Sequence, residues 1–148
     1  MYKIDFKDTI LINGIDVKVE CENNFAKKIA YILSAKDIFL KEYNGYRTYG
    51  FYCFFCNIKF KFSITFFNSK QYGHPYLIYD GENDINISWT NDINILRKCT
   101  DNLANVLIEK KIEFLSYIDD LYRFRVNTVY LDLYPSPPAM SIILSINL

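Results

Sequence analysis

The segment from Ile58 to Phe67 constrains the fold of this chain most, because apolar and polar side chains alternate along it. The apolar positions are Ile58, Phe60, Phe62, Ile64 and Phe66. The polar positions between them are Lys59, Lys61, Ser63 and Thr65. Successive side chains of a β-strand point to opposite faces, so this pattern predicts a strand with one buried face that includes Phe62. The aromatic segment Tyr49–Cys56 either belongs to the same strand or forms a separate one, paired through a turn near Asn57.

Two turn motifs extend the β pattern. Asn13-Gly14 accepts the positive φ angles of a two-residue hairpin turn and is flanked by alternating apolar residues. The segments Tyr76–Tyr79 and Ile85–Trp89 flank a turn-rich stretch of small and acidic residues, which predicts a second hairpin.

Two segments have helical spacing. Asn23 or Asn24 can cap a helix whose apolar residues recur at helical spacing from Phe25 to Leu40, ending before Asn44-Gly45. Thr90 can cap a longer one, with apolar positions that continue from Ile93 to Leu121.

The last part of the chain predicts strands at Val126–Leu133 and Ser141–Leu148. The prolines between them, which begin at Pro135, do not fit a central strand.

These elements predict an α+β fold in a single domain over residues 1–148. We expect an antiparallel β-sheet of about five to seven strands with two main helices packed on one face. We also expect lysine-bearing faces and prolines to protect the edge strands.

Composition excludes several functional classes. Seventeen Lys and Arg balance 17 Asp and Glu, without a concentrated basic stripe, so we expect no nucleic-acid partner. Apolar stretches fall far short of the roughly 20 residues of a membrane span, so we expect no membrane partner. No signal peptide is visible at the N-terminus, which favours a cytoplasmic location. The bias toward Lys, Asn, Ile, Tyr and Phe is typical of A+T-rich codons, so aromatic content alone is weak evidence of function.

The candidate catalytic and metal-binding residues are few. Cys53 and Cys56 have a spacing seen in metal and redox sites, but a second cysteine pair is missing, which favours structural thiols. His74 is the only histidine, and Pro75 after it favours a solvated loop. We therefore expect no cofactor, no metal and no catalytic residue.

Two surfaces remain as candidates for binding a partner. The first combines acidic residues with the only Trp: Asp80, Glu82, Asp84, Trp89 and Asp92. Such a patch suits a basic protein, because Trp anchors interfaces and opposite charge speeds association. The second is rich in tyrosine and includes Tyr46 and Arg47, with Tyr43, Tyr49 and Tyr52 nearby. Both surfaces also have structural explanations, as a solvated turn and as strand packing.

The function hypothesis is a non-enzymatic protein-binding domain. A small α+β domain without a visible active site is typical of immunity or inhibitor proteins, which neutralise a cognate bacterial toxin by occluding its active site. The expected partner is a protein, such as a basic toxin or enzyme domain. The alternatives are a small enzyme with a pocket around His74 and a subunit of a larger phage or secretion assembly.

Overall fold

The computed structural model describes residues 1–81 and 90–148 of the chain. The elements of its first half are β1 (Ile4–Phe6), β2 (Ile10–Ile12), β3 (Ile15–Val17), α1 (Glu22–Ile32), a short 3-10 helix (Ala35–Asp37), β4 (Phe39–Tyr43), β5 (Tyr46–Phe55), β6 (Ile58–Phe67), β7 (Lys70–Gln71) and β8 (Tyr76–Tyr79). The second half contains α2 (Ile93–Glu109), β9 (Glu113–Ile118), β10 (Leu121–Val126), β11 (Val129–Ser136) and β12 (Ser141–Asn147).

The described strands form two sheets, so the expectation of five to seven strands is wrong. A small sheet has the order β1-β2-β3, and a large nine-stranded sheet has the order β4-β5-β6-β8-β12-β11-β10-β9, with β7 paired to β6. All neighbours in both sheets are antiparallel. The chain is therefore mostly sheet, with two α-helices in its described part.

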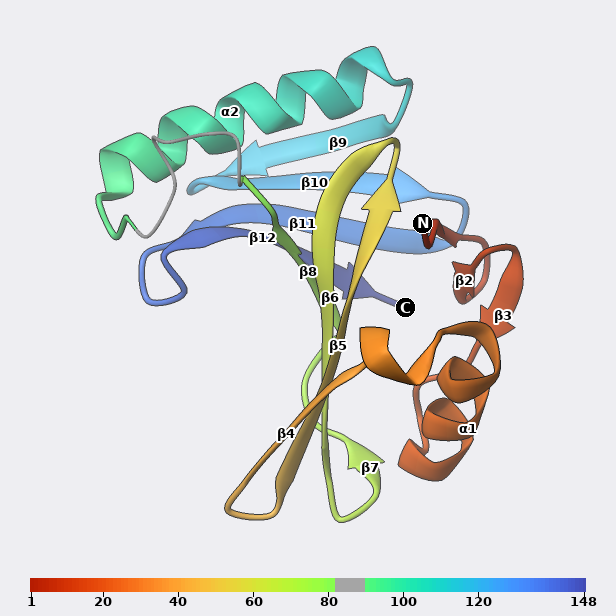
Figure 1. The fold of residues 1–148 in the computed structure, drawn as a ribbon. Coiled ribbons are helices and arrows are strands. Elements are labelled where there is room, and N and C mark those ends of the chain that lie inside the picture. Colours follow the sequence, from red (N-terminus) through yellow and green to blue (C-terminus); the bar gives the residue numbers. More distant parts are fainter. Residues whose placement is uncertain (82–89) are drawn as a thin grey trace.

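One face of the large sheet carries the core (Figure 1). Phe25 of α1 packs its ring 5.5 Å from that of Phe66, and Phe6 of the small sheet packs 5.3 Å from Phe55. On the other half of the sheet α2 contacts β11 and β12. The two helices and the small sheet thus cover the same face, which leaves the opposite face without a described element on it.

The hairpin of β5 and β6 is the centre of the core. Cys56 and Asn57 adopt positive φ angles of 53° and 62°, which make the tight turn that separates the two strands. The predicted register of β6 is confirmed, because Phe62 is 0% exposed and stacks on Phe51 at 4.8 Å. Tyr49–Cys56 and Ile58–Phe67 therefore belong to two strands.

The first predicted helix ends earlier than expected. α1 stops at Ile32, and the apolar residues Phe39 and Leu40 lie in β4. Asn44 and Gly45 have φ angles of 50° and 85° and form a hairpin turn between β4 and β5. The helical spacing of the apolar residues was coincidental, and the Asn-Gly turn had the stronger local preference.

The second predicted helix is also too long. α2 ends at Glu109, and Lys111 has a φ angle of 69° that cannot continue a helix. The apolar residues after it form β9 and β10, joined by a turn at Asp119 and Asp120, both with positive φ. The apolar residues Phe114, Leu115, Ile118 and Leu121 lie at helical spacing, but two short strands also accommodate them. The residues with positive φ therefore decide which structure forms.

The predicted strand Val126–Leu133 is displaced along the chain, since β11 extends from Val129 to Ser136 and includes Pro135. β10 pairs with β11 only as far as Leu133, so at Pro135 only β12 is a neighbour. A proline is tolerated there because the strand has a free side. The final strand is confirmed as β12.

The Asn13-Gly14 hairpin is confirmed and joins β2 to β3. Tyr76–Tyr79 is confirmed as β8, whereas Ile85–Trp89 lies outside the described residues. Of the two edge strands of the large sheet, β4 carries Lys41 as expected. The other, β9, has neither Lys nor Pro.

Candidate functional site

The uncovered face of the large sheet carries a concentration of aromatic side chains over β4, β5 and β6. Strand pairing places them together, since Tyr43 lies opposite Tyr46, and Tyr46 lies opposite Phe67. Directly opposed residues of antiparallel strands point to the same face. We call this surface the tyrosine face: Phe39, Lys41, Tyr43, Tyr46, Thr48, Tyr52, Phe67, Tyr72 and Tyr76.

The tyrosine face contains a shallow depression of about 490 Å³. Its lining residues come from three strands: Lys41, Tyr43, Tyr46, Thr48 and Tyr76. Tyr43 is 70% exposed and, opposite Tyr46, closes the hairpin of β4 and β5. A large, exposed aromatic side chain beside a concavity is available to a partner.

Ring contacts hold the tip of this surface in place. The ring of Tyr46 lies 4.7 Å from that of Phe67 and 5.0 Å from that of Tyr72. Gly45 allows this packing, because a Cβ atom built there would lie 3.2 Å from the Phe67 ring and φ is +85°. The rings are therefore preorganised before any partner arrives, which lowers the entropic cost of binding.

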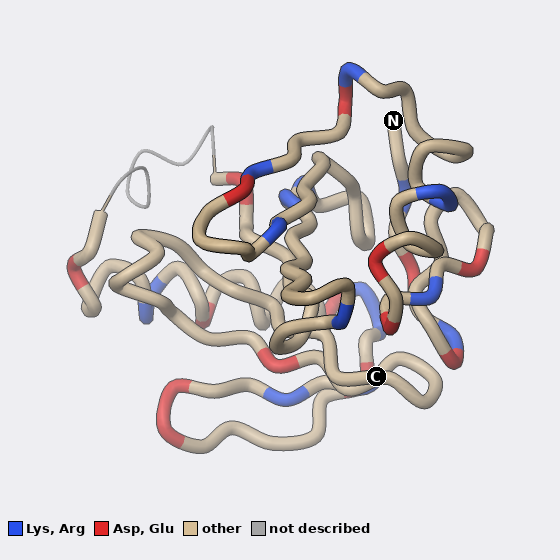
Figure 2. The backbone as a smooth tube through the Cα atoms, turned by 90° about the horizontal axis from the view of Figure 1, so that it is seen from below, with Lys and Arg blue, Asp and Glu red and all other residues tan. Residues whose placement is uncertain are grey.

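The charges on the tyrosine face are mostly positive. The Nζ atom of Lys59 lies 4.8 Å from the centre of the Tyr52 ring, and that of Lys61 lies 5.2 Å from the Phe39 ring. Lys41 lines the depression itself. Lys59 also pairs with Asp80 at 3.1 Å, so Lys41 and Lys61 are the charges that favour a partner with carboxylates on its contact surface. Over the described backbone, by contrast, acidic and basic positions are interspersed (Figure 2).

The neighbours Tyr46 and Arg47 point to opposite faces of β5. Arg47 Nε donates a 2.5 Å hydrogen bond to Glu22 Oε2 at the start of α1, and its Nη1 contacts Glu42. The hydroxyl of Tyr49 donates to the same Glu22 oxygen at 2.7 Å. Burial, followed by the hydrogen bond to this carboxylate, raises the pKa of Tyr49. Arg47 therefore ties the β4–β5 hairpin to α1, while Tyr46 belongs to the tyrosine face.

Two of the predicted acidic residues have partners within the fold. Asp80 Oδ2 lies 3.1 Å from Lys59 Nζ, and Asp92 Oδ1 accepts a 2.9 Å hydrogen bond from the backbone N–H of Asn94. Asp92 is thus the N-cap of α2. Three further candidates lie outside the described residues: Glu82, Asp84 and Trp89.

The cysteines occupy different environments. Cys53 points into the core, and burial raises the pKa of its thiol to about 12, so it is protonated at neutral pH. Cys56 lies in the β5–β6 turn and is partly exposed. Within residues 1–81 and 90–148, no group of three His, Cys, Asp or Glu side chains is arranged to hold a metal ion.

His74 lies at the edge of a smaller depression of about 290 Å³. Its other lining residues are Val19, Glu20, Gln71, Pro75, Ile146 and Leu148. Among the described lining residues, Glu20 is the one acidic side chain, and none is a Ser, Thr or Cys that could act as a nucleophile. The hypothesis of an enzyme with a pocket around His74 therefore gains no catalytic group other than Glu20 from these described neighbours.

Sequence analysis did not single out Lys41 or Tyr76 as candidate site residues. Asn44-Gly45 is the signal that could have found Lys41, since a hairpin there places it on the same face as Tyr43. Tyr76 joins them through β6, because Ser63 lies opposite it. Nothing local in the sequence predicts that pairing.

No helix in the described part of the chain is both long and apolar enough to cross a membrane. A scan against protein-family models, a search of curated proteins and a search of solved structures each found no match.

Proposed function

We propose that this chain is a non-enzymatic protein-binding domain and that the tyrosine face is its contact surface. One observation carries the proposal. The uncovered face of the large sheet presents exposed, preorganised aromatic rings around a depression, and no described element packs on them. Tyrosine offers a large contact area with few rotatable bonds and a polar tip, which explains its frequency at binding hot spots.

The chemistry of the surface favours a protein over nucleic acid. The basic side chains near this surface are lysines, and the ammonium groups of Lys59 and Lys61 lie over aromatic rings. Tyr46 and Tyr72 pack edge to face at 70°, as do Phe39 and Tyr52 at 88°, so these rings do not form parallel platforms for bases. A formal net charge of zero also gives little general attraction for phosphates.

The finer form of the proposal is an immunity or inhibitor protein that occludes the active site of a cognate toxin. Its support is the small α+β organisation together with a broad surface that suits occlusion of a partner. In that case the purified partner loses its activity in a 1:1 titration with this chain, because a bound domain blocks substrate access.

The test of the tyrosine face compares two matched variants. The first combines Tyr43→Ser with Tyr46→Ser, and the control is Tyr117→Ser, which removes an exposed tyrosine from β9. A partner is captured from a lysate of the native host, purified, and its Kd is measured by calorimetry. We expect the double variant to weaken binding about 30-fold or more, the value for loss of a hot spot, and the control to bind as the parent does.

Equal affinity of the double variant and the parent chain contradicts the proposal. Tight binding of a single-stranded oligonucleotide that the same double variant abolishes also contradicts it and assigns the face to nucleic acid. Replacing Lys41 and Lys61 with Glu adds a test of sign. Association with an acidic partner should slow, and the effect should shrink as salt rises.

A specific feature supports the assembly-subunit alternative as a second candidate. The edge strand β9 exposes apolar side chains, with Ile118 68% exposed, and its outer backbone groups have no strand beside them in the described part of the chain. Unprotected edges of this kind pair with other chains. If β9 is an assembly surface, the chain should self-associate or bind a strand partner, and Ile118→Lys should prevent this in sedimentation experiments. A monomer at all concentrations with no strand partner contradicts this alternative.

A further inference from the structure

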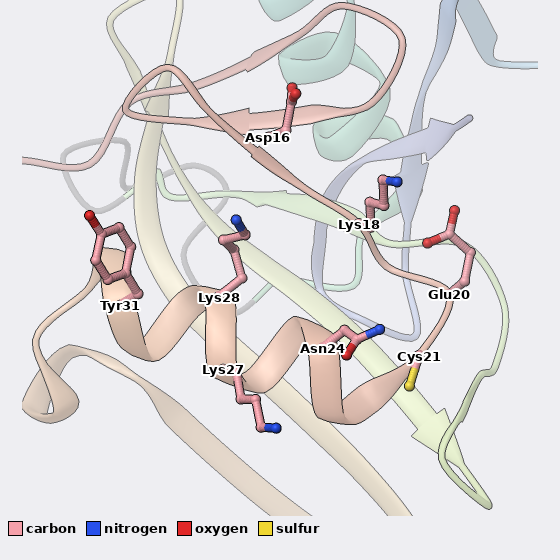
Figure 3. Close-up of a pocket in the computed structure, with 8 residues that line it drawn as sticks. All are labelled: Asp16, Lys18, Glu20, Cys21, Asn24, Lys27, Lys28 and Tyr31. Atoms are coloured by element: carbon pink, nitrogen blue, oxygen red, sulfur yellow. The ribbon is translucent and has the colours of Figure 1, made fainter.

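A second open groove lies on the covered side of the molecule, between β3 and α1 (Figure 3). Its volume is about 820 Å³, within the range of ligand-binding clefts. One wall is the extended segment from β3 to α1, which contributes Asp16, Lys18, Glu20 and Cys21. The other wall is the exposed side of α1, which contributes Asn24, Lys27, Lys28 and Tyr31.

β3 presents a free edge toward this groove. It is the last strand of the small sheet and pairs only with β2. In the two-residue hairpin at Asn13-Gly14, the closing pair Ile12 and Ile15 exchanges both backbone hydrogen bonds. The next residue, Asp16, is therefore in a non-hydrogen-bonded pair, and its backbone N–H and C=O point away from β2.

The side chains along this edge alternate in burial and in charge. Val17 and Val19 are buried, whereas the residues that alternate with them are exposed: Asp16, Lys18 and Glu20. The two-residue burial period of β3 thus continues past Val17 as far as the bend at Glu20. The exposed positions therefore present acidic, basic and acidic groups in turn along the groove.

These charges have no ion-pair partner within the described residues. Lys28 and Tyr31 of α1 stand on the far side of the groove from Asp16 and Lys18 (Figure 3). Tyr31 is 79% exposed. The opposite side of α1 packs into the core through Phe25 and Ile29, so the helix is a fixed wall.

We propose that this groove binds an extended peptide segment of a partner protein, which adds to β3 as a further strand and is covered on its other side by α1. The free N–H and C=O of Asp16 bond to the peptide backbone, as in other cases of strand addition. Charge complementarity to Asp16, Lys18 and Glu20 on the β3 wall favours a peptide with the pattern basic, any, acidic, any, basic. This pattern is the same in both directions, so it suits parallel and antiparallel addition.

The proposal goes beyond the tyrosine face and is independent of it. The groove lies on the side of the sheet that α1 covers, and the tyrosine face is on the other side. A peptide bound in the groove therefore leaves the tyrosine face free for a second contact.

The first test uses a capped synthetic peptide with the core Lys-Val-Glu-Val-Lys and a charge-reversed control with the core Glu-Val-Lys-Val-Glu. Binding is followed by NMR of the ¹⁵N-labelled chain and by calorimetry. We expect the first peptide to shift the amide signal of Asp16 and to slow its hydrogen exchange, because this amide gains an acceptor. The control peptide should bind roughly three- to thirtyfold more weakly for each reversed pair.

A pair of variants isolates the backbone contact. Asp16→Ala and Asp16→Pro both remove the carboxylate, but only the proline removes the outward N–H that the peptide needs. We expect Asp16→Ala to retain weakened binding and Asp16→Pro to lose it. Equal affinity of the two variants for the peptide contradicts strand addition.

A charge swap keeps the proposal testable even if the proline disturbs folding. Lys18→Glu should weaken the first peptide, and a peptide with Lys in the central position should restore binding to this variant. Failure of the swap, or no amide shift at millimolar peptide, overturns the proposal. The Tyr43→Ser and Tyr46→Ser variant should bind the peptide unchanged, so failure of either proposal is seen without the other.

Discussion

Replacing Phe62 with Ala is the most direct test of the fold. The side chain of Phe62 is 0% exposed and joins three elements of the core. Its ring stacks on Phe51 of β5 at 4.8 Å and on Phe25 of α1 at 6.2 Å. Truncation therefore removes the transfer free energy of a buried ring, the two ring contacts and the packing around a new cavity.

These terms place the expected loss at about 3–5 kcal/mol of the free energy of unfolding. For a chain of this size, this loss corresponds to a fall in Tm of roughly 6–20 °C. The free energy is measured by urea unfolding followed by circular dichroism, with the slope m compared between variants. An unchanged m shows that the native and denatured states have kept their compactness.

Phe67→Ala in the same strand is the matched control. Phe67 points to the uncovered face and is 38% exposed, so its loss should cost about 1 kcal/mol or less. Equal destabilisation by the two substitutions would refute the assignment of faces in β6. A loss below about 1 kcal/mol for Phe62→Ala would show that the ring is not in a packed core.

Three further predictions concern other parts of the chain. Arg47→Ala should lower the free energy of unfolding in urea by about 1–3 kcal/mol, because the Glu22 carboxylate, in a side chain only 10% exposed, loses a hydrogen-bond donor. Glu42→Ala, at the exposed partner of Arg47, should change this free energy little. Cys53, with a pKa near 12, should resist alkylation at pH 8 until denaturant is added; rapid labelling of the native chain, detected by mass spectrometry, would show that it is accessible. Replacing Asp80, Glu82 and Asp84 together with Lys should slow association with a basic partner by about one to two orders of magnitude at low salt. Association rates that are unchanged in stopped-flow experiments would exclude an acidic docking patch.

The sequence predicted strands where side chains alternate strictly or where a turn is recognisable. The hairpin of β2 and β3 was predicted because alternation coincides with the Asn13-Gly14 turn, whose residues have positive φ. β6 was predicted from its alternation alone. The helical predictions failed where apolar residues at helical spacing continued past the true end of the helix. After Ile32 these residues lie in β4, which the Asn44-Gly45 turn joins to β5. In the second pattern, Lys111 and the turn at Asp119-Asp120 have positive φ and interrupt the helical spacing. Local turn preference therefore decided what apolar spacing left open.

The order of strands in the large sheet was not predictable from local pattern. β8 lies between β6 and β12, and its partner Leu144 is 67 residues from Leu77 along the chain. Such pairings depend on how the whole core packs. The depression beside Tyr76 depends on these pairings. The sequence therefore indicated Tyr43 and Tyr46 but did not place Tyr76, on the correctly predicted strand β8, beside them.

Tyrosines of one strand lie on both faces of the large sheet, some in the core and some on the uncovered face. Aromatic content alone could therefore not indicate function. In β5, Tyr49 points into the core and donates to Glu22, whereas Tyr46 and Tyr52 point to the uncovered face. A codon bias toward tyrosine raises both groups equally, but only the core positions are also required by packing. An exposed tyrosine at a position of the uncovered face costs solubility and adds nothing to the core. Tyr43, which is 70% exposed, and the half-buried Tyr46 both line the depression, so they are better evidence of a binding surface than the number of tyrosines in the chain.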